Sequence, residues 1–323
     1  MAMSKPIYQP LDDQIRHDLD AEYVAFHDEY IQYIEPDDVR PWNPEQARSR
    51  RLPVPSLETS PISRTETIDL SNFAVRVFWP YGERPSAGWP VLVWYHGGGW
   101  AVGSIESEND FCTKMCSDAN CVVVTVGYRL APEHPYPVPV EDALEALVWV
   151  QSDEGRRVLE INPTKIAIGG TSAGANLSVV TTLKASLLPT SIPIIFQILI
   201  VPVIDNTATE ETTWAARAKA PWLTPARMTW YRKMYLPDPS QALNWDASPN
   251  HASPQLLTKV PRTWLAVAEQ DLLAPEALLF AAQLRGAGVN VETVEYEGMT
   301  HTILAMNGRR PYFLPGNVFS TPT

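Results

Sequence analysis

The stretch IAIGGTSAGANLS, residues 166–178, decides which fold the chain adopts. An apolar run typical of a strand, residues 166–168, ends in two glycines, and residues 175–178 open a helix. Residues 170–174, GTSAG, fit the pattern G-x-S-x-G, in which a sharp strand-to-helix turn exposes a serine at the edge of the sheet. The pattern predicts that Ser172 is a nucleophile. The N-terminus of the following helix would favour a developing negative charge beside it.

A second glycine-rich stretch, HGGGW at residues 96–100, follows directly on the apolar run at residues 91–95. Successive glycines let backbone N–H groups approach a substrate oxygen without a clash with side chains. Acyl transfer needs such donors, and each is worth about 10²–10³ in rate. The stretch therefore predicts an oxyanion hole, and we expect His96 to hold the loop by hydrogen bonding rather than to titrate in catalysis.

The base and the acid follow from their order along the chain. Of the six histidines, His301 is the one that follows the last expected core strand, so its side chain can reach over the carboxyl edge of the sheet. Asp271 ends the preceding strand and could accept the imidazole N–H. The order Ser172, Asp271, His301 is that of α/β-hydrolases. Glu269 stays open as an alternative acid, because it lies two residues upstream.

Apolar runs that predict strands alternate with helical stretches along most of the chain. This alternation predicts an α/β fold with a mostly parallel central sheet flanked by helices. The expected strands are residues 67–70, 73–79, 90–95, 121–126, 165–168, 194–201, 263–268 and 291–296. The expected helices are residues 139–151, 173–187 and 275–286, with one or two amphipathic helices within residues 10–35.

Residues 205–254 interrupt this alternation, since they hold many aromatic side chains and no run typical of a strand. Two interpretations remain open. The segment could be a helical lid over an apolar pocket, or a helical excursion whose aromatic side chains pack on the core.

Composition excludes several other classes of protein. The 323 residues are 45% hydrophobic, enough for a sizeable core, and their formal net charge of −12 argues against nucleic-acid or anionic-membrane surfaces. The N-terminus lacks the apolar run of a secretory signal, and the most apolar segment, residues 192–204, is too short to span a bilayer. We therefore expect a cytoplasmic enzyme without integral membrane association. Cys112, Cys116 and Cys121 are expected to be buried, reduced thiols rather than metal ligands.

With these motifs in place, the chain resembles the hormone-sensitive-lipase family of α/β-hydrolases over nearly its whole length. The matching stretches are HGGG at 96–99, GTSAG at 170–174, YRLAPE at 128–133, EDA at 141–143, WDASP at 245–249 and DLL at 271–273. Thr171 departs from the resemblance, because many members carry an acidic residue at that position.

The resemblance implies a helical cap and a set of binding residues. The cap would consist of residues 1–60 and 205–254, and the hydrolase core of residues 61–204 and 255–323. The oxyanion donors would be the N–H groups of Gly98, Gly99 and Ala173. We assign to the border of the substrate pocket Trp100, Asp205, Trp214 and Trp222.

Together these features predict a serine carboxylic ester hydrolase that acts through an acyl-enzyme on a small to medium, apolar ester, with no metal or organic cofactor. One alternative is a biosynthetic enzyme that uses the same triad for lactonisation, acyl transfer or cyclisation. A more distant alternative is a ligand-binding receptor on this scaffold. The gibberellin receptor, which is similar in fold, lacks the histidine that stands here at His301. A homodimer is compatible with the sequence.

Overall fold

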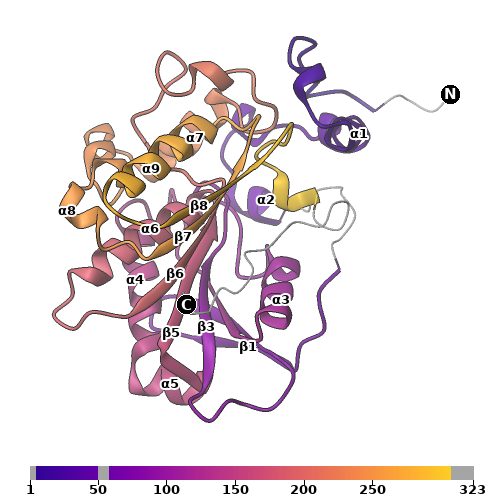
Figure 1. The fold of residues 1–323 in the computed structure, drawn as a ribbon. Coiled ribbons are helices and arrows are strands. Elements are labelled where there is room, and N and C mark those ends of the chain that lie inside the picture. The colour runs from indigo at the N-terminus through magenta and orange to yellow at the C-terminus, as the bar shows by residue number, and fades with distance from the viewer. Residues whose placement is uncertain (1–4, 50–57, 307–323) are drawn as a thin grey trace.

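The computed structural model describes residues 5–49 and 58–306, and one eight-stranded sheet forms its centre (Figure 1). The strand order is β1-β2-β4-β3-β5-β6-β7-β8. The six strands β4, β3, β5, β6, β7 and β8 are adjacent in this order and run parallel to one another, whereas β2 runs antiparallel to both of its neighbours. The strands are β1 (Arg64–Asp69), β2 (Ala74–Trp79), β3 (Trp89–Tyr95), β4 (Val122–Val126), β5 (Ile161–Thr171), β6 (Ile194–Ile200), β7 (Arg262–Ala268) and β8 (Val291–Tyr296). The mostly parallel sheet expected from the alternating pattern is confirmed.

The central strands are apolar because both faces of the sheet are covered. In β3, Val91, Val93 and Tyr95 pack on one face, and Leu92 and Trp94 pack on the other. All eight expected strands are present. β5 begins four residues earlier than its apolar run predicts, at Ile161, which pairs with Trp89 ahead of a shift in register.

Helices form a layer on each side of the sheet (Figure 1). Buried side chains of α4, α6 and α9 pack on one face, and those of α1, α3 and the turn η7 pack on the other. The helices are α1 (Ala21–Glu29), α2 (Pro44–Ser49), α3 (Asn109–Asp118), α4 (Val138–Gln151), α5 (Asp153–Leu159), α6 (Ala173–Ser186), α7 (Pro225–Tyr235), α8 (Pro254–Leu257) and α9 (Ala274–Gly286). The 3₁₀ turns are η1 (Arg16–Asp18), η2 (Ile31–Tyr33), η3 (Asp37–Val39), η4 (Ala215–Arg217), η5 (Pro239–Leu243), η6 (Pro249–His251) and η7 (Ile303–Met306).

The three helices expected after β4, β5 and β7 are α4, α6 and α9, and the structure adds α2, α3, α5, α7 and α8 to them. Within residues 10–35, the helical spacing corresponds to α1 and the short turns η1 and η2. Helix α1 begins after Asp20, whose carboxylate accepts the backbone N–H groups of Glu22 and Tyr23. Residues 205–254, all of which the structure describes, contain α7 and three 3₁₀ turns and no strand, as the sequence predicts.

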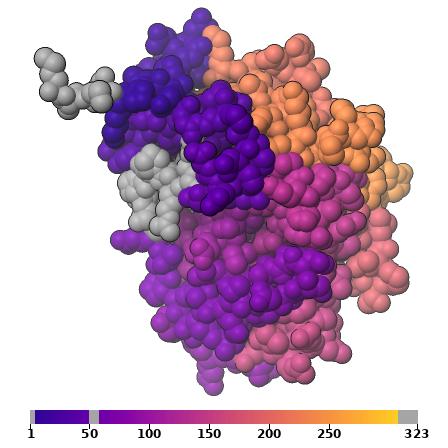
Figure 2. All heavy atoms as spheres, turned by 180° about the vertical axis from the view of Figure 1, so that it is seen from behind, coloured from indigo at the N-terminus to yellow at the C-terminus, as the bar shows by residue number. Residues whose placement is uncertain are grey.

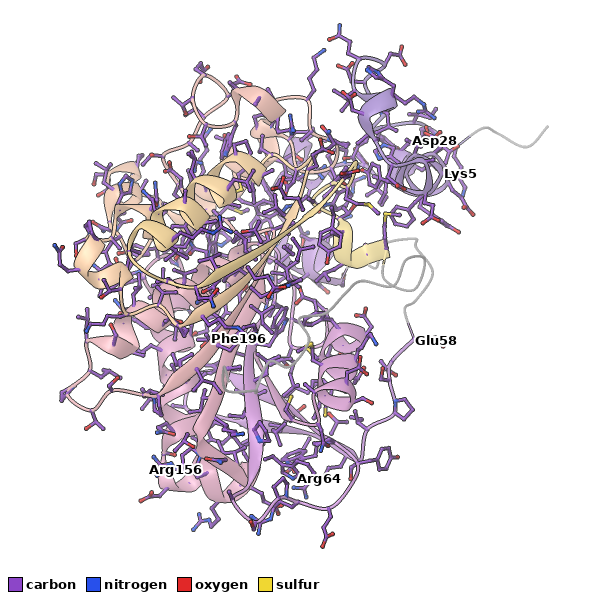
Figure 3. All side chains as sticks on the ribbon, in the orientation of Figure 1. Lys5, Asp28, Glu58, Arg64, Arg156 and Phe196 are labelled. Atoms are coloured by element: carbon purple, nitrogen blue, oxygen red, sulfur yellow. The ribbon has the colours of Figure 1, made fainter. Side chains whose placement is uncertain are left out.

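The N-terminal segment lies against residues 205–254 at one end of the molecule. Arg227 of α7 donates from Nε to Asp38 Oδ1 over 2.9 Å and from Nη2 to Gln9 Oε1 over 2.9 Å. Figure 2 shows the indigo N-terminal residues beside residues of this later segment. At the opposite end of the molecule lie Arg156 of α5 and Arg64 of β1 (Figure 3).

Parts of two segments in the expected division into cap and core lie outside the described residues. Residues 1–4 and 50–57 of the first segment, and residues 307–323 of the last, lie outside them. Among the described helices, none has the length and apolar character needed to cross a membrane.

Candidate active site

The turn between β5 and α6 has the backbone geometry that G-x-S-x-G predicts. Ser172 has φ of 54° and ψ of −117°, a conformation that non-glycine residues rarely adopt. A Cβ atom at Gly174 would lie 2.0 Å from the carbonyl oxygen of Tyr95, and one at Gly170 would lie 2.4 Å from the carbonyl carbon of Gly174. Both positions therefore require glycine, and the turn holds the Ser172 side chain at the N-terminus of α6.

Ser172, His301 and Asp271 meet at the carboxyl edge of the sheet. They follow β5, β8 and β7, whose parallel order brings their ends together. His301 Nε2 lies 2.9 Å from Ser172 Oγ, and His301 Nδ1 lies 2.8 Å from Asp271 Oδ2. With the proton on Nδ1, the imidazole donates to the carboxylate and accepts from the serine hydroxyl, which is the geometry that nucleophile activation needs.

The two acidic residues after β7 have different partners. Asp271 is 1% exposed, and its Oδ1 also accepts the backbone N–H of Leu273 over 3.2 Å. Glu269 does not contact the imidazole through a hydrogen bond. Its Oε2 instead accepts the backbone N–H of Gly298 over 2.8 Å, in the loop that leads to His301. Glu269 thus supports the histidine loop, and Asp271 contacts the histidine itself.

Gly97, Gly98 and Gly99 form the loop that follows β3. Gly98 has φ of 115° and Gly99 has φ of 56°, values in the left-handed region that favours glycine. A Cβ atom at Gly98 would lie 2.2 Å from the carbonyl oxygen of Val102. One at Gly99 would lie 2.3 Å from the ring of Tyr231, so this ring from α7 packs directly on the loop. The predicted oxyanion residue Ala173 is the first residue of α6, directly after Ser172.

His96 anchors this loop. Its ring stacks on Tyr128 with centroids 4.4 Å apart, and its Nδ1 lies 2.7 Å from the carbonyl oxygen of Gly97. The hydroxyl of Tyr128 donates to the carbonyl oxygen of His96 over 2.8 Å. Burial lowers the pKa of His96 to about 4, so the ring is neutral at physiological pH. These contacts agree with the structural role that the sequence predicts for His96.

The four residues assigned to the pocket border differ in exposure. Trp100 is fully buried and stacks on Tyr235 with centroids 4.1 Å apart. Trp214 is 1% exposed and donates from Nε1 to Glu276. Asp205 and Trp222 are partly buried, and Trp222 lies under the guanidinium of Arg227. A pocket role for these four residues stays a prediction, and for Trp100 and Trp214 the contacts described are those of core packing.

Sequence reasoning missed three residues beside the site. Glu108, which precedes α3, accepts the backbone N–H of Gly97 over 2.9 Å. Tyr231 covers Gly99, as described above. Arg48 of α2 donates to the carbonyl oxygens of Ala101 and Ala131 over 3.0 Å each. Local patterns around these residues give no signal of the contacts, because each contact joins separate elements of the fold.

The three cysteines are free and buried, and burial raises the pKa of each thiol. Within residues 5–49 and 58–306, no three His, Cys, Asp or Glu side chains are grouped so that they could hold a metal ion.

Comparison with known proteins agrees with the fold. The alpha/beta hydrolase fold family, Abhydrolase_3, matches residues 92–305. An AB hydrolase superfamily protein of Schizosaccharomyces pombe is 39% identical over 311 residues, covering 92% of this chain and 91% of its own length. The carboxylesterase NlhH of Mycobacterium tuberculosis is 34% identical over 265 residues, 79% of this chain and 80% of its own. The crystal structure of carboxyl esterase 2 from Tuber melanosporum matches with a TM-score of 0.78 at 27% identity, covering 90% of this chain and 93% of the other.

The fold, the two glycine motifs and these relatives lead to one classification. Two of these relatives, NlhH and carboxyl esterase 2, are named as carboxyl esterases. The chain is a carboxylesterase-type hydrolase and belongs to the alpha/beta hydrolase fold family, in its hormone-sensitive-lipase-like carboxylesterase group.

Proposed function

We propose that Ser172, His301 and Asp271 are the catalytic triad of this carboxylesterase and that its substrate is a small to medium, apolar ester. Ser172 Oγ attacks the ester carbonyl while His301 Nε2 takes the hydroxyl proton, and Asp271 holds the tautomer and stabilises the imidazolium. The imidazolium then protonates the departing alcohol, which leaves an acyl-enzyme. Water, deprotonated by the same imidazole, releases the acid.

The negative oxygen of each tetrahedral intermediate would be held by the N–H groups of Gly98, Gly99 and Ala173. These groups lie on the two turns that flank Ser172, one after β3 and one at the N-terminus of α6. Two turns on neighbouring parallel strands can present donors to the same oxygen, and the dipole of α6 adds to the stabilisation.

One observation carries this proposal: the imidazole of His301 lies between Ser172 Oγ at 2.9 Å and Asp271 Oδ2 at 2.8 Å. The three residues come from separate segments of the chain, and their order is the one expected of α/β-hydrolases. Both contacts have hydrogen-bond length, so no rearrangement is needed before the serine can be activated.

Residues 1–60 and 205–254 would form the cap over this site. The support is that Tyr231 of α7 packs on Gly99, and that Arg227 of the same helix holds Asp38 and Gln9. A cap built in this way restricts the room beside the oxyanion loop and favours esters of limited size. The cytoplasmic location and the homodimer stay predictions of the sequence.

The test of the triad is Ser172→Ala, assayed with p-nitrophenyl acetate and butyrate. We expect kcat/KM to fall by at least about 10³-fold, because removal of a triad residue leaves only the contributions of binding and the oxyanion hole. Circular dichroism and thermal unfolding should match the wild type. A fluorophosphonate probe should label the wild-type serine and leave the variant unlabelled.

Ester hydrolysis near the wild-type rate by Ser172→Ala would refute the assignment of the nucleophile. Covalent labelling combined with transfer of the acyl group to a second substrate, rather than to water, would instead favour the biosynthetic alternative. The relatives give that alternative and the receptor alternative no support.

A further inference from the structure

A carboxylate that the triad mechanism does not use lies directly beneath the two glycine turns. It belongs to Glu108, which precedes the first residue of α3. Glu108 occupies the N-cap position of that helix, but its side chain makes no capping hydrogen bond there. It turns instead toward the carboxyl ends of β3 and β5, where the oxyanion loop and the nucleophile are held.

Three donors from these strand ends converge on Glu108. Its Oε1 accepts the backbone N–H of Gly97 over 2.9 Å. Its Oε2 accepts the indole N–H of Trp94 over 2.5 Å and faces the hydroxyl of Thr171 at 3.4 Å. Trp94 and Gly97 belong to β3 and the loop after it, whereas Thr171 is the residue directly before Ser172. One carboxylate therefore joins the oxyanion loop to the nucleophile turn.

The hydrogen bond from Gly97 to Glu108 lies directly before the expected oxyanion donors, the N–H groups of Gly98 and Gly99. With its N–H bonded to Glu108, Gly97 has a fixed peptide orientation ahead of Gly98 and Gly99, which are the residues with positive φ. Gly97 is also close to the nucleophile, because a Cβ atom built on it would lie 3.6 Å from Ser172 Cβ and 3.5 Å from Glu108 Oε1. A shift of this glycine would move the loop relative to the serine.

We propose that Glu108 is a positioning residue for the oxyanion hole: its carboxylate fixes the loop at Gly97 relative to Ser172 without touching the substrate. The inference rests on the proposed triad and oxyanion hole. It predicts that Glu108 matters little for binding of the ester in its ground state. It matters for the tetrahedral state, in which the donors must lie within hydrogen-bond distance of the negative oxygen.

Burial also makes this carboxylate sensitive to pH. Burial raises the pKa of Glu108 to about 7, against the opposing effect of its N–H donors, and the neighbouring Asp110 raises it further. Cys112 and Tyr128 also face the group, and its charge contributes to the raised pKa of each. The ionised form, which can accept all three donors, is gained as the pH rises through about 7.

The test compares Glu108→Gln with a matched control, Glu106→Gln. Glutamine keeps the shape of Glu108 but has only one acceptor oxygen, so in either orientation its NH₂ group faces donors, either Gly97 or the pair Trp94 and Thr171, and the link between the loop and the nucleophile turn is broken. Glu106 is a glutamate two residues away, 65% exposed, whose carboxylate pairs with Arg76 at 2.8 Å. Both variants should be assayed at pH 8 on p-nitrophenyl butyrate, with an aryl trifluoromethyl ketone as a tetrahedral-state analogue.

We expect Glu108→Gln to lower kcat by about 10- to 100-fold, less than complete loss of a donor costs, with KM within about threefold of the wild type. The inhibition constant of the ketone should rise by about the same factor as kcat falls. Between pH 6 and 8.5, the wild-type kcat should show an ionisation near 7 that the variant lacks. Glu106→Gln should behave as the wild type throughout.

The proposal is overturned if Glu108→Gln keeps kcat within about twofold, or if its loss lies in KM or the folded fraction while the ketone binds as before. Should this variant fail to fold, Glu108→Asp serves in its place, because it keeps the charge but its shorter side chain cannot reach both strand ends. It should then show the same parallel loss of kcat and ketone affinity. Failure of the triad is distinguishable, since Ser172→Ala would then stay active whatever Glu108 does.

Discussion

Individual side chains at this site are distinguished by what they touch rather than by their type. Asp271 and Glu269 are both acidic residues after β7, yet Asp271 accepts from the imidazole of His301 and Glu269 accepts from the backbone of Gly298. Gly298 has φ of 65°, and a Cβ atom there would lie 2.4 Å from the backbone nitrogen of Asp20. The histidine loop is therefore held from one side by Glu269 and from the other by the N-terminal segment.

This difference in contacts predicts different effects on catalysis. We expect Asp271→Asn to lower kcat by about 10³- to 10⁴-fold, because an amide at this position favours the wrong imidazole tautomer. Glu269→Gln keeps an oxygen that can accept from Gly298 and should lower kcat by less than about tenfold. Steady-state kinetics on p-nitrophenyl butyrate measures both. A mild effect of Asp271→Asn together with a severe effect of Glu269→Gln would reverse the assignment of the acid.

Among the elements, α7 has contacts in three directions. Tyr231 packs on the oxyanion loop, Tyr235 stacks on Trp100, and Arg227 reaches the N-terminal segment. The side chains of Arg227 and Asp38 are only 7% and 11% exposed, so their ion pair is shielded from water. Arg227 also donates to the carbonyl oxygen of Trp222. This one side chain ties the two expected parts of the cap together.

Removal of one partner from a shielded ion pair leaves the other charge uncompensated. We expect Arg227→Met to lower the free energy of unfolding by about 3 kcal/mol, as measured by urea denaturation. The control is Lys114→Met, which breaks an ion pair with Asp118 whose side chains are 40% and 51% exposed. Such exposed pairs contribute about 0–1 kcal/mol, so this variant should unfold near the wild-type midpoint. Equal effects of the two substitutions would contradict a structural role for the Arg227 link.

At the scale of the whole molecule, buried titratable groups make stability depend on pH. Glu276 is 2% exposed, and its carboxyl group accepts the backbone N–H groups of Ile204 and Asp205 and the indole N–H of Trp214. Burial raises its pKa from 4.5 to about 8. Between these values the unfolded chain has lost the proton that the folded protein keeps, so this group makes stability fall as the pH rises. His96, with its pKa lowered to about 4, has the opposite effect, mainly below pH 6.5.

We therefore expect the free energy of unfolding of Glu276→Gln to depend less on pH than that of the wild type. One proton changes the free energy of unfolding by at most about 1.4 kcal/mol per pH unit. Urea denaturation at intervals from pH 5.5 to 8.5 should show that the wild type loses more stability over this range than the variant. Parallel curves for the two proteins would mean that Glu276 keeps an ordinary pKa in the folded state.

The elements that the sequence predicts well are those in which a local pattern carries the whole signal. β4 reads VVVTV because both faces are covered, and the turn at Ser172 needs glycine on both sides. The hydrophobic periodicity of helix α7 is weaker, because one of its buried residues is the charged Arg227, and a search for periodic apolar residues does not find it. Glu108 and Glu106 look alike in the sequence, and only the packing of α3 against the strands separates a carboxylate beneath the loop from one on the surface. In the same way, the fact that Trp214 is aromatic does not show whether it lies in the core or at the border of a pocket.

The position of His301 after β8 has a consequence for the chain during synthesis. Under the proposed mechanism, Ser172 and Asp271 leave the ribosome before His301. β8, which pairs with β7, is translated just ahead of His301. A chain that stops before residue 301 can thus contain all eight described strands and still lack the base, so we expect a nascent chain to gain hydrolytic activity only after His301 has left the ribosome.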